Sequence, residues 1–369
     1  MGRAAASRLP YDGAMSTRIA AIVRPLVLRL VALAERYPGT LALFGFLSGV
    51  ASFILVDRQA GLAKVIAALM LASWVWLTLE NLLRDGIARR FGFDLPPVVL
   101  KFATQLVHQE SLFFVLPFFF FSTTWASGQI VFTGLLMIGA LVSIVDPLYY
   151  KWLSKRRWVY LGFHSLTLFA VLLTALPIII HLTTSQSYVL AMVITLLLSF
   201  PSLPQTVPLK RWWRVPLLAL MLGSLGVTMW AAQLWVPPAT LRLTDVAITT
   251  ELDNQQRTPG ERINHISADA LQHNGLFAYT AVNAPRGLNE RIYHVWRHEG
   301  QQVDKIALDI RGGREAGYRA WTRKRHFPAD PSGRWQVQIV TEGGQLLGIL
   351  RFRVAPSTTP TPTPTPTPP

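Results

Sequence analysis

Long apolar runs alternate with short polar segments over the first 236 residues. An α-helix needs about 20 apolar residues to cross a hydrocarbon core about 30 Å thick. Seven of the runs approach or reach that length, so residues 38–236 are predicted to form a seven-span helical membrane bundle. The expected spans lie at about 40–56, 62–79, 98–121, 129–145, 158–180, 187–201 and 215–236.

After Pro237 and Pro238 the apolar residues occur in short runs, which indicates β-strands. Residues 334–341 alternate most regularly, because Trp335, Val337 and Ile339 share one face of an extended chain. Turns rich in glycine and proline separate the runs. This spacing predicts an all-β, sandwich-like domain over residues 240–355. Its strands are expected at about 241–249, 261–267, 276–283, 290–298, 301–310, 317–325, 334–341 and 345–354.

The two ends of the chain differ from the parts between them. Residues 1–37 are predicted to be a cytoplasmic segment with a basic helix lying on the membrane surface, since Arg18, Arg29 and Arg36 fall on one helical face. An ordinary basic flank of the first span is the alternative. Residues 356–369 repeat Thr-Pro and are expected to form a disordered, extended tail.

The charged residues set the expected orientation of the bundle. Lys and Arg are frequent after the second, fourth and sixth predicted spans, whereas residues 122–128 and 181–186 contain neither. Since Lys and Arg favour the cytoplasmic side of a membrane, the N-terminus is expected in the cytoplasm and the β-domain outside it. This asymmetry accounts for most of the net charge of +15. The lipid bilayer is therefore the expected partner, and nucleic acid is not.

Several kinds of chemistry are excluded by the residues that are missing. The chain has no cysteine, so disulfides and thiolate catalysis are excluded. It also has no H-E-x-x-H, no G-x-S-x-G and no phosphate-binding glycine loop. No catalytic residue, metal or cofactor is predicted, and an enzyme is the less favoured class.

The third predicted span is unusually polar for a membrane helix. It contains Lys101, His108 and Glu110, and His164 lies in the fifth span. Ionisable residues are costly inside a bilayer, so these four are candidates for a proton path or metal site in a transporter or membrane-embedded enzyme. Such a site requires His108 and His164 to meet, while Glu110 points about 200° away from His108 on the helix. Hydrogen bonding between helices, with Lys101 reaching the cytoplasmic surface, is the favoured interpretation.

Aromatic and basic residues alternate on two predicted strands of the β-domain. Arginine pairs bidentately with carboxylate or phosphate, so this pattern is typical of a site for an anionic glycan or lipid. The alternative is that the tryptophans pack in the core and the arginines form a solvated face. The candidate residues are His294, Trp296, Arg311, Arg314, Arg319, Trp321 and Arg323.

Two runs near the C-terminus carry a family resemblance. They are HVWRHEGQQVDKIALDIRGGREAGYRAWTRK and PSGRWQVQIVTEGGQLLGILRFRV. They resemble the C-terminal domain of an uncharacterised family of bacterial multi-span envelope proteins, specifically over about 290–354 and more loosely over the spans. The resemblance implies an inner-membrane protein with a periplasmic β-domain, and it assigns no reaction or ligand. The expected function is non-enzymatic: the domain binds a glycan, an anionic lipid or an envelope protein.

Overall fold

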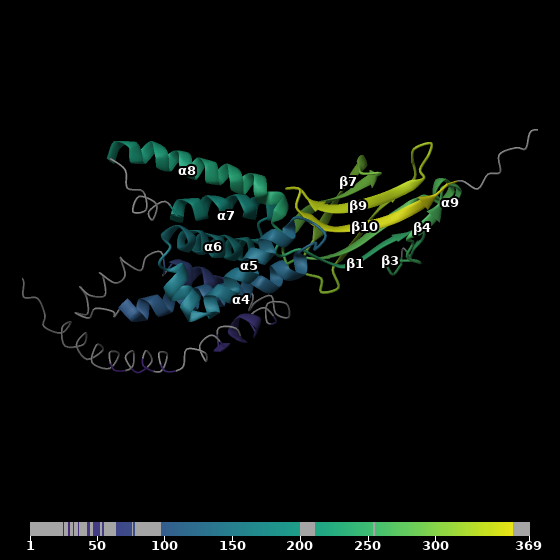
Figure 1. The fold of residues 1–369 in the computed structure, drawn as a ribbon. Helices are drawn as coiled ribbons and strands as arrows, with labels where there is room; N and C mark the ends of the chain where they lie inside the picture. Colours follow the sequence, from purple (N-terminus) through teal and green to yellow (C-terminus); the bar gives the residue numbers. More distant parts are fainter. Residues whose placement is uncertain are drawn as a thin grey trace, which may run out of the picture. The chain divides into compact units, whose positions relative to one another are not determined.

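The computed structural model describes residues 64–75, 97–199, 211–253 and 255–356, together with residue 77 and scattered residues between 25 and 54. Most of the predicted N-terminal segment, most of the first predicted span and nearly all of the Thr-Pro tail lie outside these residues. The described chain is helical up to Trp235 and mainly β-stranded from Arg242 onward (Figure 1). A helical N-terminal region followed by a β-sheet domain is thereby confirmed.

The helical region contains helices of very different lengths. Lys64–Val75 is a short apolar helix. The helices that follow are α4 (Pro97–Ser122), α5 (Gln129–Ile144), the π-helical turn η1 (Pro147–Leu153), α6 (Arg157–Ile180), α7 (Thr184–Ser199), α8 (Arg211–Ala231) and the 3-10 turn η3 (Ala232–Trp235).

The described residues do not support seven membrane spans. Two helices, Arg157–Ile180 and Val215–Trp235, are long and apolar enough to cross a membrane. A third span results if α5 and η1, which meet at an angle of 102°, count as one. Helix α7 has only 16 residues, about 24 Å of helix, which is less than the core thickness of about 30 Å. Helix α4 is 26 residues long, but its polar first half lowers its hydropathy.

The chain forms two compact units. The first comprises residues 1–115, 136–171 and 197–209, and the second comprises residues 116–135, 172–196 and 210–369. In the first unit the helices approach closely at Gly49, where an added Cβ would overlap the Cβ of Phe113. A larger side chain at Gly49 would therefore require these backbones to separate.

The second unit contains a β-domain built from two main sheets. One has the strand order β1-β5-β8, the other has the order β4-β10-β9-β6-β7, and β2 and β3 form a separate hairpin. All pairs are antiparallel except β4 with β10. The strands are β1 (Arg242–Thr249), β2 (Leu252–Asp253), β3 (Thr258–Pro259), β4 (His265–Ser267), β5 (Leu276–Asn283), β6 (Asn289–His298), β7 (Gln301–Arg311), β8 (Tyr318–Lys324), β9 (Gly333–Thr341) and β10 (Leu346–Ala355).

Seven of the eight predicted strands agree with these bounds to within one residue at each end. The exception is 261–267, of which only β4 is a strand, and the helix α9 (Ala268–Asn274) follows it directly. The Ser267 side chain caps α9 by accepting a hydrogen bond from the backbone N–H of Ala270, and Gly275 ends it at φ 68°. Seven residues are too few for a helical period to stand out in the sequence.

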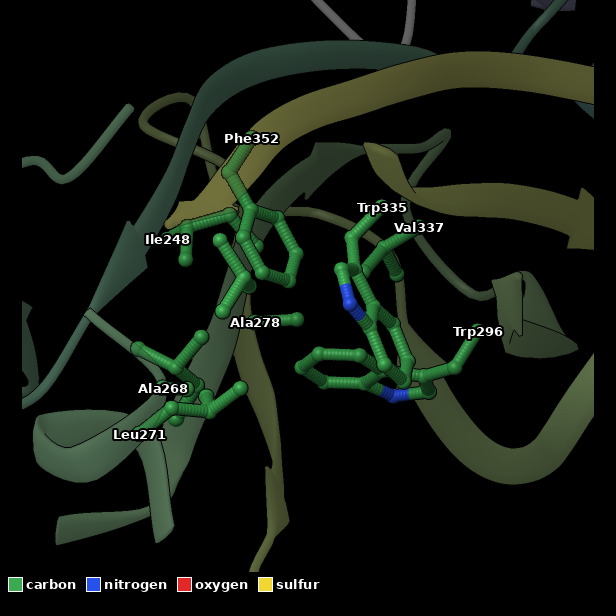
Figure 2. Close-up of a cluster of buried hydrophobic side chains, with 10 residues drawn as sticks. Ile248, Ala268, Leu271, Ala278, Trp296, Trp335, Val337 and Phe352 are labelled. Carbon is green, nitrogen blue, oxygen red and sulfur yellow. The ribbon is translucent and has the colours of Figure 1, made fainter. Parts of the chain in front are cut away.

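The core of the β-domain lies between the two main sheets. Trp296, Trp335, Val337 and Phe352 come from the five-stranded sheet, and Ile248 and Ala278 come from the three-stranded one. Figure 2 shows these side chains together with Leu271 of α9. The ring of Trp335 stacks on those of His298 and Phe352, with ring centroids 4.5 and 6.0 Å apart. This aromatic stack holds the two strands β9 and β10 against β6.

Candidate functional site

Two of the residues predicted to bind a ligand lie inside the β-domain. His294 and Trp296 of β6 both have 0% of their surface exposed. The Nε2 atom of His294 lies 3.2 Å from the Thr280 hydroxyl, and its Nδ1 atom lies 2.9 Å from the Thr322 hydroxyl. Burial lowers the pKa of His294 to about 3. His294 therefore bridges the two sheets as a neutral imidazole, and neither side chain is accessible to a ligand.

The residues predicted on β8 face the opposite side of the three-stranded sheet. Trp321 packs with Tyr279 in a separate outer cluster, below the guanidinium of Arg257 at 5.5 Å. The Nη1 atom of Arg319 donates to the carbonyl of Gln256 at 2.6 Å. Residues 256 and 257 lie in the β2–β3 hairpin, which thus covers much of this face.

The remaining predicted arginines are exposed but not grouped with the tryptophans. Arg323 stacks on Phe277 at 5.0 Å, and Arg314 stacks on Tyr318 at 5.3 Å. Arg311 is exposed at the end of β7. The seven candidates do not form one surface, because the alternation along β6 turns His294 and Trp296 inward while that along β8 turns Arg319, Trp321 and Arg323 outward.

A different set of arginines shares the outer face of the five-stranded sheet. Arg353 of β10 is paired with Arg334 of β9, and Arg351 is paired with Gln336, which is paired in turn with Arg297 of β6. Residues directly opposite each other on neighbouring strands share one face. The residues between them, Trp335 and Phe352, lie in the core, so these four arginines point outward. We call Arg297, Arg334, Arg351 and Arg353 the arginine face.

Positive charge is in excess on the arginine face. Glu299 pairs with Arg334 through a 3.2 Å contact between Oε2 and Nη2. The backbone N–H of Arg334, and then its guanidinium, lower the pKa of Glu299. Within the described chain, neither Arg351 nor Arg353 has an acidic partner. Toward the other end of the same sheet, Arg291 pairs with Asp309 at 2.7 Å.

The arginine face also carries polar, uncharged groups. Gln336 lies between Arg351 and Arg297 in register, and Gln338 follows it on the same face of β9. Neighbouring strands lie about 4.8 Å apart, so the row Arg351–Gln336–Arg297 extends about 10 Å across the sheet. The row presents guanidinium donors for carboxylate or phosphate, with an amide between them for hydroxyl groups.

The arginine face was not predicted from the sequence, although the pattern of one of its strands indicates part of it. Arg351 and Arg353 alternate with the apolar residues Leu350 and Phe352 along one predicted strand. Their neighbours Arg297 and Arg334 come from two other strands, and the register that aligns them depends on pairing between distant segments. That register was not readable from local alternation.

The polar residues of the helical region form a second candidate site, in the first unit. His108 of α4 has 0% of its surface exposed. Its Nε2 atom lies 3.0 Å from Nδ1 of His164 on α6, and its Nδ1 atom lies 2.9 Å from the Tyr149 hydroxyl on η1. The two histidines thus meet, as a joint site requires. Lys101 is exposed and Glu110 is half-buried, and neither contacts the histidines.

A layer of hydrogen bonds accompanies the histidine pair. The Nε2 atom of Gln105 donates to Asp146 Oδ1 at 2.8 Å and to the Ser143 carbonyl at 3.1 Å. Tyr150 donates its hydroxyl hydrogen to the side-chain oxygen of Gln105. The tyrosines were missed because residues after Asp146 and Pro147 were expected to form a loop, whereas the π-helical turn η1 directs Tyr149 toward His108.

Comparison with known proteins assigns the chain to families without a known function. Residues 20–278 match the family of unknown function DUF5924, and residues 289–354 match the protein of unknown function DUF2914. No curated protein matches the chain. The expectation of an uncharacterised family is confirmed, while membrane placement and bacterial origin stay predictions.

The two matched regions meet inside the β-domain. Strands β1 and β4 and the start of β5 belong to the first region, and β6 to β9 with most of β10 belong to the second. Because β5 pairs with β8 and β4 pairs with β10, both main sheets combine strands from the two regions. The first match covers more than half of the chain, and the protein therefore belongs to the DUF5924 family.

Proposed function

We propose that this protein is an integral membrane protein that holds its β-domain outside the cytoplasm, where the arginine face binds an anionic glycan of the cell envelope. In this proposal the helical region crosses the membrane an odd number of times and the N-terminus is cytoplasmic. The observation that carries the binding function is the excess of positive charge on the arginine face, where Glu299 is the carboxylate in contact with it.

Apolar side chains on the surface of the helices support the membrane placement. Val215, Leu220, Val227 and Trp230 of α8 are all largely exposed. Soluble monomeric proteins rarely expose apolar patches of this extent. Lipid around α8 would bury these side chains and remove their contact with water.

The chemistry of the arginine face favours a glycan over a lipid headgroup. Its arginines are interleaved with Gln336 and Gln338, whose amides both donate and accept hydrogen bonds and so suit hydroxyl groups. The row lies along a sheet surface and spans several strands, an arrangement that fits an extended polymer. Carboxylates on that polymer would pair with Arg351 and Arg353, which have no acidic partner among the described residues.

A binding experiment with the full-length protein in nanodiscs of neutral lipid tests the proposal. The probe is a carboxylated oligogalacturonate, with neutral maltoheptaose and vesicles of phosphatidylglycerol as comparisons. We expect oligogalacturonate to bind and maltoheptaose not to. Replacing Arg351 and Arg353 together by Gln should weaken binding by at least about tenfold, which corresponds to about 1.4 kcal/mol.

The matched control replaces Arg311 and Arg314 by Gln, which removes the same charge from another part of the domain. We expect this control to change the affinity by less than about twofold, because Arg311 pairs with Asn289, eight residues along β6 from Arg297, and Arg314 lies beyond the end of β7. Equal losses in both double variants would contradict the proposal and indicate attraction by net charge alone. Binding to phosphatidylglycerol vesicles without binding to oligogalacturonate would contradict the glycan and favour a lipid surface.

A further inference from the structure

We infer that His265 is a further member of the ligand-binding surface, and that its protonation makes the arginine face bind an anionic glycan more tightly in mildly acidic solution. This inference rests on the proposed function, because it concerns the same surface and the same ligand. It adds one binding residue from a strand that carries none of the four arginines, and it makes the affinity depend on pH.

His265 lies in β4, which forms one edge of the five-stranded sheet next to β10 (Figure 1). It is paired with Arg353, and the backbone N–H of Arg353 donates to the Asn264 carbonyl at 2.9 Å. Side chains alternate between the two faces of a sheet along each strand. Because the next residue, Ile266, packs against the core, the exposed side chain of His265 points outward beside Arg353.

His265 therefore ends a row of three residues that crosses the sheet. Arg353 is paired with His265 on β4 and with Arg334 on β9. Since neighbouring strands lie about 4.8 Å apart, this row extends about 10 Å across the sheet. The row through Arg351 and Gln336 lies two residues further along the same strands, about 7 Å away. A ligand on this face thus meets donors in two adjacent rows.

The groups around His265 leave a place for an anion. β4 has no other charged residue, and the elements that pack most closely against it are β10 and α9. Their charged and titratable residues are Arg351 and Arg353 of β10, and Asp269 and His273 of α9. One strand further, Glu299 is bound to Arg334 at 3.2 Å. Within the described chain neither acid forms an ion pair with His265, so a carboxylate from the ligand can lie between His265 and Arg353.

Such a carboxylate couples the binding of the glycan to the binding of a proton. Histidine is the side chain that ordinarily changes its charge between about pH 5 and pH 8. An opposite charge within about 4–6 Å favours the charged form of a titratable group. The bound carboxylate therefore favours the imidazolium form of His265. By thermodynamic reciprocity, protonation of His265 favours the bound glycan to the same extent.

The test measures oligogalacturonate binding to the full-length protein in nanodiscs of neutral lipid at pH 7.5 and pH 6. The probe stays ionised at both, because carboxyl groups ordinarily titrate near pH 4. We expect the affinity to be about two- to threefold higher at pH 6, on the scale of one exposed ion pair. His265→Gln should abolish this rise. His265→Arg should also abolish it, and should bind at pH 7.5 about as tightly as the unmodified protein does at pH 6.

His273→Gln is the matched control, since His273 is exposed on α9 and its Nδ1 atom lies 2.9 Å from the Asp269 carbonyl. This variant should keep the rise. Calorimetry at pH 6.5 in buffers of different ionisation enthalpy should show proton uptake on binding, which His265→Gln should remove.

Two results would overturn this inference and leave the proposed function intact. They are an affinity that is equal at both pH values, and a rise that His265→Gln retains. Absence of oligogalacturonate binding at both pH values would overturn the proposed function as well.

Discussion

The carboxylate of Glu290 caps helix α7 through Thr184. Its Oε2 atom accepts a hydrogen bond from the Thr184 backbone N–H, and its Oε1 atom accepts one from the Thr184 hydroxyl, each at 2.8 Å. Glu290 has only 3% of its surface exposed. A negative charge is favourable near a helix N-terminus, where backbone N–H groups lack partners. Within the second unit, this cap joins the second residue of β6 to the first residue of α7.

Other contacts of the second unit join further parts of the helical chain to the β-domain. Gln129 donates to the Leu346 carbonyl at 2.8 Å, and Gln345 donates to the Val236 carbonyl at 2.9 Å. The ring of His181 lies so close to Gly287 that an added Cβ would be 2.8 Å from it. Polar contacts thus join the β-domain to the ends of helices within the second unit. Each of the two glutamine donors has one acceptor at hydrogen-bond distance, so each contact requires one relative placement of the two groups.

Glu290→Ala is expected to weaken this attachment. The variant leaves the Thr184 N–H without its acceptor in a buried position, which costs about 1–3 kcal/mol. Thr184→Val removes only the hydroxyl contact and is expected to cost about half as much. Thermal unfolding of the full-length protein in detergent measures both. A Glu290→Ala variant as stable as the unmodified protein would contradict the capping role.

The lowered pKa of His294 predicts that the β-domain becomes less stable in acid. This pKa is about 3 in the folded protein and about 6.5 in an unfolded chain. Because the folded pKa is lowered, the unfolded state binds the proton first, and stability falls as the pH drops from about 6.5 toward 3. Between pH 6.5 and 5 the loss should be about 2 kcal/mol.

The comparison of His294→Gln with His273→Gln at pH 7.5 and pH 5 isolates this effect. His294→Gln should be less stable at pH 7.5, because two hydroxyl contacts change, yet should lose less stability on acidification. His273 is exposed on α9, and its replacement should preserve the acid sensitivity. Equal acid sensitivity in all three proteins would exclude His294 as its source.

The strands were predictable from the sequence, and the arginine face was not. Along β9, Trp335, Val337 and Ile339 alternate with glutamines, so local pattern alone defines the strand and its inner face. Along β6, the same alternation does not reveal that His294 faces Thr280 and Thr322 of the other sheet. The hairpin that covers Trp321 depends on contacts of Arg319 and Arg257 with residues about 60 positions away in the sequence.

The helical site shows the same limit. Ionisable residues are costly inside a bilayer, which makes His108 and His164 candidates from the sequence alone. A joint site requires the two side chains to lie close together. Tyr149 could not be added, because its approach depends on the bend of 102° between α5 and η1. A bend of this kind follows from tertiary packing and from Pro147 at the start of η1.

Replacing either of two buried tryptophans in the same core by Phe is expected to lower the stability of the protein by different amounts. Trp335 donates its indole hydrogen to the Pro331 carbonyl at 2.8 Å, whereas the indole nitrogen of Trp296 is buried without a hydrogen-bond partner. Trp335→Phe loses a hydrogen bond and volume, while Trp296→Phe loses volume and an unsatisfied donor. We expect Trp335→Phe to be the less stable variant by about 1–3 kcal/mol.

Chemical unfolding of the full-length protein, followed by near-ultraviolet circular dichroism, measures this difference. Both variants create a similar cavity in one cluster, so each serves as the control for the other. Equal losses would indicate that an acceptor, such as a buried water, satisfies the Trp296 nitrogen.

The side of the membrane that holds the β-domain depends on whether the number of spans is odd or even. Seven spans, or the three that the described residues supply when α5 and η1 count as one, place the β-domain opposite the N-terminus, whereas two spans return it to the same side. Alkaline phosphatase fused after Pro369 should therefore be active, and green fluorescent protein at that position should be dark. Active phosphatase also requires the basic loops to lie in the cytoplasm, so replacing Arg84, Arg89 and Arg90 by Ser should reduce its activity. A bright fluorescent fusion with inactive phosphatase would place the β-domain in the cytoplasm, where the arginine face could not meet an envelope glycan.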